Sequence, residues 1–264
     1  MIEFIVIGES RADAEIATKL AERILLEKID WLEPEYLQYS FSWSGLQENT
    51  DYSCWRDIEK IIDNFQQSSP FRIPKYKRSR ETQEKKPLKP DAARAIKVLN
   101  LVRFLQRKRE IKAVVFIRDL DNQPERREGL EQARMQHLNQ SNKLEIIIGT
   151  ANGKREAWVL NGFVALNQDE QRILDEIKTE LDFDPCLKSH RLRSPSNQEP
   201  ERIRNPKFVV ARLTGEDWER ERQCWAETDL QILRERGVET KLTDYLNQIE
   251  ERLVPIFSSD TRAK

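Results

Sequence analysis

The sequence predicts an α/β protein with a mainly parallel sheet and helices on both of its faces. Short runs of β-branched and aromatic residues, typical of buried strands, occur at 2–7, 113–117 and 144–148. Each run precedes a stretch whose apolar residues recur at helical spacing, and alternating strands and helices are typical of parallel sheets. The low counts of glycine (8) and proline (11) argue against a turn-rich all-β fold.

The N-terminal region opens with the strand at 2–7 and a tight turn at Gly8. A helix is expected over 11–28, for which Ser10 is a suitable N-cap. Weak alternation predicts a second strand over 36–43, and apolar spacing predicts a short helix over 55–65.

A basic, mobile insertion is expected at about 70–90, because residues 71–90 contain eight Lys or Arg against two Glu. Beyond it, helical spacing recurs four times. The predicted helices cover 91–109, 125–138, 156–164 and 168–181.

The C-terminal part is predicted to be a basic loop followed by a helical extension. The loop covers 184–205, and the helices are expected at 206–213, 215–236 and 242–254. We therefore divide the chain into an α/β domain (1–181), a basic loop with its helical extension (182–257) and a flexible tail (258–264). Trp158 and Trp225 are expected in the core, and His137 on an exposed polar helix face.

Composition restricts the class of protein. Lys and Arg total 45 and Asp and Glu total 46, so net charge is uninformative about nucleic acid. The three cysteines are isolated, which predicts no structural zinc site, no disulfides and a reducing cytoplasm. No apolar run approaches the roughly 18 residues of a membrane span, so we expect no membrane partner. The absence of a Walker lysine motif and of GxGxxG disfavours nucleotide hydrolysis and dinucleotide binding.

Acidic residues follow three of the predicted strands. Glu9 comes after the first, Asp119 and Asp121 after the second, and Glu156 shortly after the third. Ligands bind beyond the carboxyl ends of parallel strands, and clustered carboxylates there suit Mg²⁺ or Mn²⁺. The alternative is a purely structural role, in which these acidic residues pair with arginines such as Arg118 or cap the next helix.

The chain resembles Toprim domains, which occur in primases, topoisomerases and the overcoming-lysogenization-defect nucleases. The resemblance lies in Phe-Ile-Val-Ile-Gly-Glu-Ser at 4–10 and in the strand that ends in Asp-Leu-Asp at 119–121. Glu156-Ala157-Trp158 also matches small Toprim-like bacterial proteins of unknown function that are encoded beside an ATPase. The resemblance implies a Toprim/Rossmann-like sheet and a partner ATPase of ABC or AAA type.

The resemblance further implies metal-assisted phosphodiester hydrolysis. In that scheme Asp119 and Asp121 bind Mg²⁺ or Mn²⁺, Glu156 binds or orients a second ion, and Glu9 is the general base or a further ligand. One departure is clear: the family's glutamate precedes the glycine, where this chain has Ile7. Glu9, on the other side of the turn, is the candidate replacement.

Basic residues in two loops are candidates for binding nucleic acid. Lys75, Lys77 and Arg78 surround Tyr76, and Arg191 and Arg193 lie in the C-terminal loop. A solvated loop is the alternative for the first group. Pairing with local glutamates, such as Glu199 and Glu201, is the alternative for the second.

Two functions from different classes follow. The first is a Mg²⁺-dependent nuclease or related phosphodiester hydrolase, acting in defence against foreign DNA. The second is a non-catalytic Toprim-like subunit that binds an ATPase partner or nucleic acid. A phosphate- or nucleotide-binding regulator is a weaker third reading. The choice between DNA and RNA and the existence of a homo-oligomer stay open.

Overall fold

A computed structural model describes residues 1–72, 87–138 and 143–259 of the chain. Its centre is a five-stranded sheet in which every pairing between the described strands is parallel. Four strands lie in the order β2-β1-β4-β5, and β3 pairs with β1. The strands are β1 (Ile2–Gly8), β2 (Phe41–Ser44), β3 (Ser53–Cys54), β4 (Ile111–Asp119) and β5 (Glu145–Ala151). The predicted α/β class is therefore confirmed.

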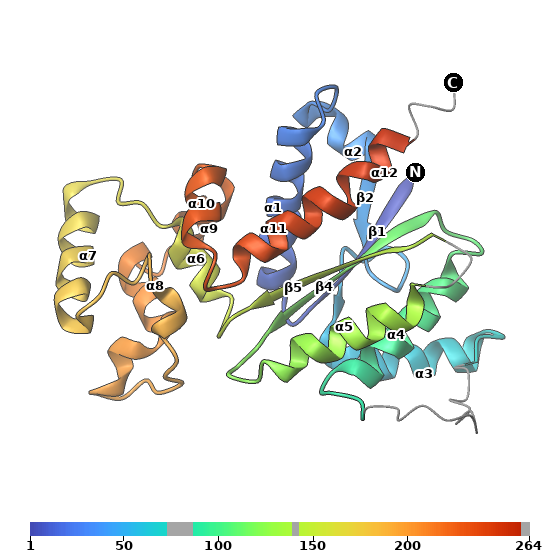
Figure 1. Ribbon diagram of the computed structural model, residues 1–264, viewed down its shortest axis with the longest axis horizontal. Helices are drawn as coiled ribbons and strands as arrows, with labels where there is room; N and C mark the ends of the chain where they lie inside the picture. The colour runs from blue at the N-terminus through green and yellow to red at the C-terminus, as the bar shows by residue number, and fades with distance from the viewer. Residues whose placement is uncertain (73–86, 139–142, 260–264) are drawn as a thin grey trace.

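Helices cover both faces of this sheet (Figure 1). α1 and α11 lie on one face, and α3, α4 and α5 lie on the other. Their bounds are α1 (Arg11–Lys28), α3 (Ile58–Ser68), α4 (Ala92–Leu105), α5 (Glu125–His137) and α11 (Leu242–Arg252). Each face has its own apolar cluster, with Phe4 in one and Ile5 in the other. Because both faces are covered, the central strands are continuous apolar runs.

The predicted C-terminal helical extension is confirmed, and most of it forms a group beyond the end of the sheet at which β5 leads into α6 (Figure 1). The described helices of the predicted extension are α8 (Pro206–Thr214), α9 (Trp218–Ala226), α10 (Leu230–Arg236), α11 and α12 (Val254–Ser259). The group beyond the sheet also contains α6 (Glu156–Gly162) and α7 (Gln168–Leu181), which the prediction assigned to the α/β domain. The predicted domain boundary after residue 181 stays a prediction. Within the three described ranges, no helix is both long and apolar enough to cross a membrane.

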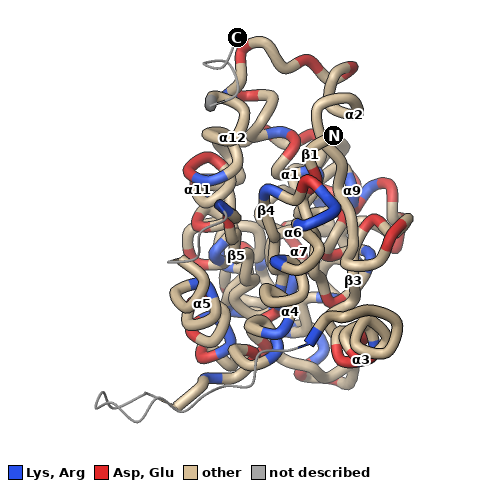
Figure 2. Tube along the Cα trace, turned by 90° about the vertical axis from the view of Figure 1, so that its right-hand side faces the viewer, with Lys and Arg blue, Asp and Glu red and all other residues tan. Residues whose placement is uncertain are grey.

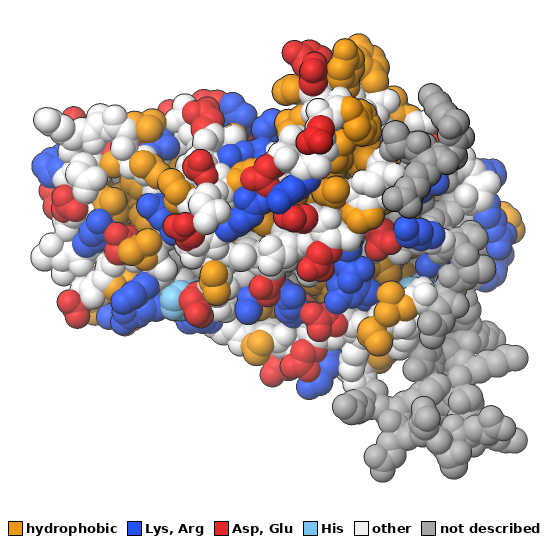
Figure 3. Space-filling view, turned by 45° about the horizontal axis from the view of Figure 1, so that its top comes forward, with side chains coloured by type: hydrophobic (Ala, Val, Ile, Leu, Met, Phe, Trp, Pro, Cys, Tyr) orange, Lys and Arg blue, Asp and Glu red, His pale blue; other side chains and the backbone are white. Residues whose placement is uncertain are grey.

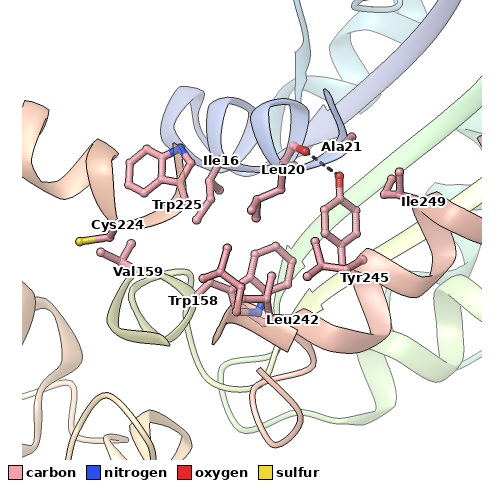
Figure 4. Packing of buried hydrophobic residues seen from close by; sticks show 14 of the residues in the cluster. Ile16, Leu20, Ala21, Trp158, Val159, Cys224, Trp225, Leu242, Tyr245 and Ile249 are labelled. Carbon is pink, nitrogen blue, oxygen red and sulfur yellow. Dashed lines mark hydrogen bonds between the residues drawn. The ribbon is translucent and has the colours of Figure 1, made fainter. Parts of the chain in front are cut away.

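Aromatic side chains join these helices to the rest of the molecule (Figure 4). The rings of Trp158 and Tyr245 stack with their centroids 5.3 Å apart. The Tyr245 hydroxyl donates to the main-chain oxygen of Ala17 at 2.8 Å, so α11 is fixed against α1. Trp158 and Trp225 are both buried, as predicted.

The predicted strand over 36–43 is wrong in its first half. A short 3-10 helix (Pro34–Tyr36) and α2 (Leu37–Ser40) precede β2. Tyr36 and Tyr39 are exposed, so the aromatic residues that suggested a strand do not reach the core. Pairing with β1 begins only at Phe41, which is buried.

The helix predicted over 215–236 is two helices, α9 and α10. The break is stabilised from α1, because the Arg23 guanidinium donates to the main-chain oxygens of Trp225 and Thr228. The Asp229 side chain then caps α10 by accepting the Gln231 N–H at 2.6 Å. These side-chain partners replace the helical hydrogen bonds that are lost.

Two smaller expectations also need correction. His137 is buried, because the last turn of α5 packs beside α4 and its main-chain oxygen accepts a hydrogen bond from Arg103. Burial lowers the pKa of His137 to about 4. The expected tail begins too early, since Ser258 belongs to α12. Residues 260–264 lie outside the described residues.

Candidate functional site at the carboxyl ends of β1 and β4

The order of the sheet reverses between β1 and β4. From β1 the chain passes through α1 to β2 on one side, and it later returns to β4 on the other. In open parallel sheets the crevice at such a switch point is the usual ligand site. Glu9 directly follows β1, and Asp119 is the last residue of β4. The Asp119 N–H donates to Oε1 of Glu9 at 3.0 Å, so Glu9 does reach this crevice.

Four acidic side chains gather here, and we call them the carboxylate cluster: Glu9, Asp13, Asp119 and Glu156. The sequence predictions for Glu9, Asp119 and Glu156 thus fall in one place. Ile7, at the position of the family's glutamate, is fully buried in the apolar core and takes no part.

Asp13 was missed by the sequence analysis, although a signal for it exists. It lies in the same helical phase as Ala17, Leu20 and Ile24, which form the buried stripe of α1. A carboxylate on a buried stripe requires a polar partner. The Ser10 hydroxyl donates to Oδ2 of Asp13 at 2.6 Å, while the Ser10 oxygen also accepts the Asp13 N–H and caps α1, as predicted.

The electrostatics of the cluster centre on Asp119. Burial, together with the other carboxylates of the cluster, raises the pKa of Asp119 to about 8. Burial also raises the pKa of Glu9 and of Asp13 above the usual values. Burial and the neighbouring carboxylates both favour the protonated form of Asp119, so a cation bound beside it would favour loss of that proton.

Arg118 neutralises one side of the cluster. Its side chain is only 8% exposed and forms ion pairs with Glu9 and with Asp91, the latter at 3.0 Å from Nε. Its guanidinium carbon lies 4.9 Å from the centre of the Trp55 ring. The expectation that an arginine would pair with these acids is thus met for Glu9, whereas Arg118 is not paired with Asp119.

Arg155 neutralises the other side. Its guanidinium lies 3.4 Å from Glu156 and 3.8 Å from Asp13, and it also pairs with Glu221 of α9. The main-chain N–H of Arg155 donates to Oδ1 of Asp119 at 2.8 Å. Through Glu221 the C-terminal helices therefore reach the carboxylate cluster.

Asp121 lies beside the cluster, where its charge still acts on Asp119 and Glu9, and its pairing with Asp119 as a metal ligand stays a prediction. Its side chain is 39% exposed and pairs with Arg126 at 2.9 Å. Asp121 and Asn122 both have positive φ, so the chain turns sharply after Asp119 and carries Asp121 outward. Asp121 does not cap α5, because the N-cap position is Pro124.

The donor chemistry of the cluster fits a hard divalent cation, since carboxylate oxygens are the preferred ligands of Mg²⁺. The arrangement is a different matter. In the part of the chain that the structure describes, no group of three or more Asp, Glu, His or Cys side chains is placed to hold a metal ion. Guanidinium groups contact several of the oxygens instead. A preformed metal cage is therefore not part of this geometry.

The predicted nucleic-acid residues are only partly described. Lys75, Lys77 and Arg78 lie outside the described residues. Arg191 lies over the Phe183 ring, with its guanidinium carbon 4.2 Å from the ring centre. Arg193 lies near the site, as described below. Acidic and basic residues are interspersed along the chain and over the face shown in Figure 3 (Figures 2 and 3), so a polyanion would depend on local positive charge.

Comparison with known proteins gave no match at the level of family models, curated proteins or solved structures. The Toprim resemblance therefore stays a prediction, and the functional argument depends on the site itself.

Proposed function

We propose that this chain is a phosphodiester hydrolase, a nuclease that depends on Mg²⁺ or Mn²⁺. The supporting observation is the position of Asp119, a half-buried acid whose pKa is raised to about 8 among further carboxylates at the switch point of the sheet. A cation bound beside Asp119 would favour its ionised form and reduce the repulsion among these carboxylates.

The residues have separate roles in this proposal. Asp119 and Glu156 supply the oxygens for a cation, Asp121 is the outer ligand, and Glu9 accepts or holds a proton. A bound Mg²⁺ supplies Lewis acidity toward a phosphate oxygen. Because Arg155 contacts Glu156, an incoming cation must compete with this guanidinium for the same carboxylate.

Titration calorimetry with Mn²⁺ and Mg²⁺ tests the cation site. We expect the wild-type chain to bind Mn²⁺ and release a proton below about pH 8, because binding ionises Asp119. Asp119→Asn should weaken binding by at least roughly tenfold. The matched control is Glu176→Gln on the outer helix α7, which removes an exposed carboxylate far from the cluster. Affinity unchanged in Asp119→Asn would contradict the site.

Cleavage assays on DNA and RNA follow with the same variants. We expect hydrolysis by the wild type and by Glu176→Gln, and none by Asp119→Asn or with excess EDTA. Hydrolysis that persists in EDTA would show that the reaction does not need a divalent cation.

A second candidate function is a non-catalytic subunit that binds an ATPase partner or nucleic acid. The observation that favours it is the double pairing of Arg118 and Arg155, which already satisfies much of the cluster. A folded wild-type chain that neither binds Mn²⁺ nor cleaves nucleic acid would favour this function over the first.

A further inference from the structure

A groove opens beside the carboxylate cluster, at the carboxyl ends of β4 and β5. It encloses about 230 Å³. Three loops form its walls: the loop after β4, the loop after β5 and the segment before α8. The lining residues are Asp121, Asn122, Gly153, Lys154, Leu192, Arg193, Ser194, Pro195 and Pro206. Asp121, two residues after Asp119, and Lys154, directly before Arg155, therefore border the groove.

The two cations of the groove are not neutralised. Within the described ranges, neither Lys154 nor Arg193 has a carboxylate within ion-pair distance, and no hydrogen bond involves the Lys154 ammonium. Arg193 is held by two neutral groups instead, Oδ1 of Asn122 at 2.6 Å and Oδ1 of Asn152 at 3.0 Å. Its position is fixed while its full charge stays available.

Asp121, which also lines the groove, does not neutralise these two cations. The carboxylate of Asp121 is already paired with Arg126 at 2.9 Å. Ser194 adds a neutral group: its oxygen accepts the Ser196 N–H at 3.1 Å, which leaves its hydroxyl proton able to bond a ligand. The groove therefore offers two cations and a hydroxyl, which is the chemistry that binds an anionic oxygen.

Size and composition narrow the ligand to a phosphate. The volume is below the roughly 300–1,000 Å³ of typical small-molecule pockets. None of the described residues that line the groove is aromatic, so no ring is present on which a base could stack. The groove accommodates a phosphate with part of its sugar rather than a buried nucleotide.

We propose that this groove binds one backbone phosphate of a nucleic-acid strand, with Lys154 and Arg193 as its ligands. The identity of the strand rests on the proposed function, whereas the anion site rests on the groove alone. A phosphate held here places the next part of the strand at the mouth of the crevice that contains Asp119. The groove then determines which position along the nucleic-acid strand faces the crevice.

Fluorescence anisotropy of a labelled oligonucleotide, measured in EDTA, tests the proposal without hydrolysis. Lys154→Met should weaken binding by roughly three- to tenfold and lower the salt slope by about one. Arg193→Lys, which keeps the charge but loses the two amide contacts, should have a smaller effect. The control Lys112→Met removes an exposed lysine at the start of β4, the opposite end of the sheet, and should change neither quantity.

The outcomes separate this proposal from the nuclease proposal. Binding that depends on Lys154, in a chain that never cleaves, supports the groove and contradicts the nuclease. Cleavage with binding equal in wild type, Lys154→Met and Lys112→Met overturns the groove and leaves the nuclease. Competition by inorganic phosphate as strong as that by the oligonucleotide would show a site for free phosphate, which contradicts a strand-binding role.

Discussion

In two neighbouring regions at the same edge of the sheet, the positively charged side chains have opposite surroundings. In the carboxylate cluster, Arg118 and Arg155 are 8% and 12% exposed and each contacts two or more carboxylates. In the groove beyond β4 and β5, the cations Lys154 and Arg193 have no ion-pair partner among the described residues. The cluster is acidic and internally paired, and the groove is basic and open.

The difference follows from desolvation. A buried guanidinium stays charged but loses its water, and this cost is offset only if carboxylates or other acceptors replace that water. A cation at the rim of a groove keeps its hydration and needs no internal partner, so it is available to an external anion. The comparison therefore separates structural arginines from basic residues that can bind a ligand, although both kinds lie at the same edge of the sheet.

The largest expected effect on stability is that of replacing Arg118, one of the two arginines beside the carboxylate cluster. Arg118→Met keeps the bulk beside Trp55 but leaves Glu9 and Asp91 without their cation. We expect a loss of about 3–5 kcal/mol in the free energy of unfolding, measured in urea. The control Arg212→Met removes a surface arginine that also pairs with two glutamates, and should cost at most about 1 kcal/mol. Equal losses would mean that burial does not distinguish these pairs.

An intermediate effect is expected from Asp119. Its pKa is about 8 in the folded chain, well above its ordinary value near 3.8, so the folded state holds this proton more tightly than the unfolded state. The stabilisation is complete below about pH 4 and is lost as the pH rises through 8. The slope is at most about 1.4 kcal/mol per pH unit.

Asp119→Asn tests this directly, because an amide cannot ionise and its oxygen can still accept the Arg155 N–H. Urea unfolding at a series of pH values should show a decline for the wild type that is shallower in Asp119→Asn. The two curves should diverge in favour of the variant as the pH approaches 8. Parallel curves would mean that Asp119 titrates normally in the folded chain.

Most of the fold could be predicted from the sequence because the central strands are buried on both faces. Continuous apolar runs identify β1, β4 and β5 without knowledge of their neighbours. The edge strand β2 was harder, since Tyr36 and Tyr39 carry strand propensity but lie on exposed turns of helix. The break between α9 and α10 depends on Arg23 from α1, a contact separated by about 200 residues that local periodicity cannot show.

The sequence could predict only those residues of the candidate site that follow the ends of predicted strands. Glu9, Asp119 and Glu156 follow parallel strands, and their approach is a consequence of the sheet order. Asp121 lies outside the cluster because the chain turns at residues 121 and 122, where φ is positive, and its carboxylate pairs with Arg126. Its role as a ligand stays a prediction. Lys154 carries no sequence signal at all, because its importance comes from the absence of an ion-pair partner among the described residues.

The smallest expected effect on stability is that of replacing the cations of the groove. Lys154→Met removes a cation that has no described partner, so the free energy of unfolding should change by no more than about 0.5 kcal/mol. Arg193→Lys loses two contacts to neutral amide groups and should cost slightly more. Urea unfolding of both variants, beside Arg118→Met, gives the comparison. If Lys154→Met were as destabilising as Arg118→Met, its ammonium would be a structural cation, and the groove would have no free positive charge to offer a phosphate.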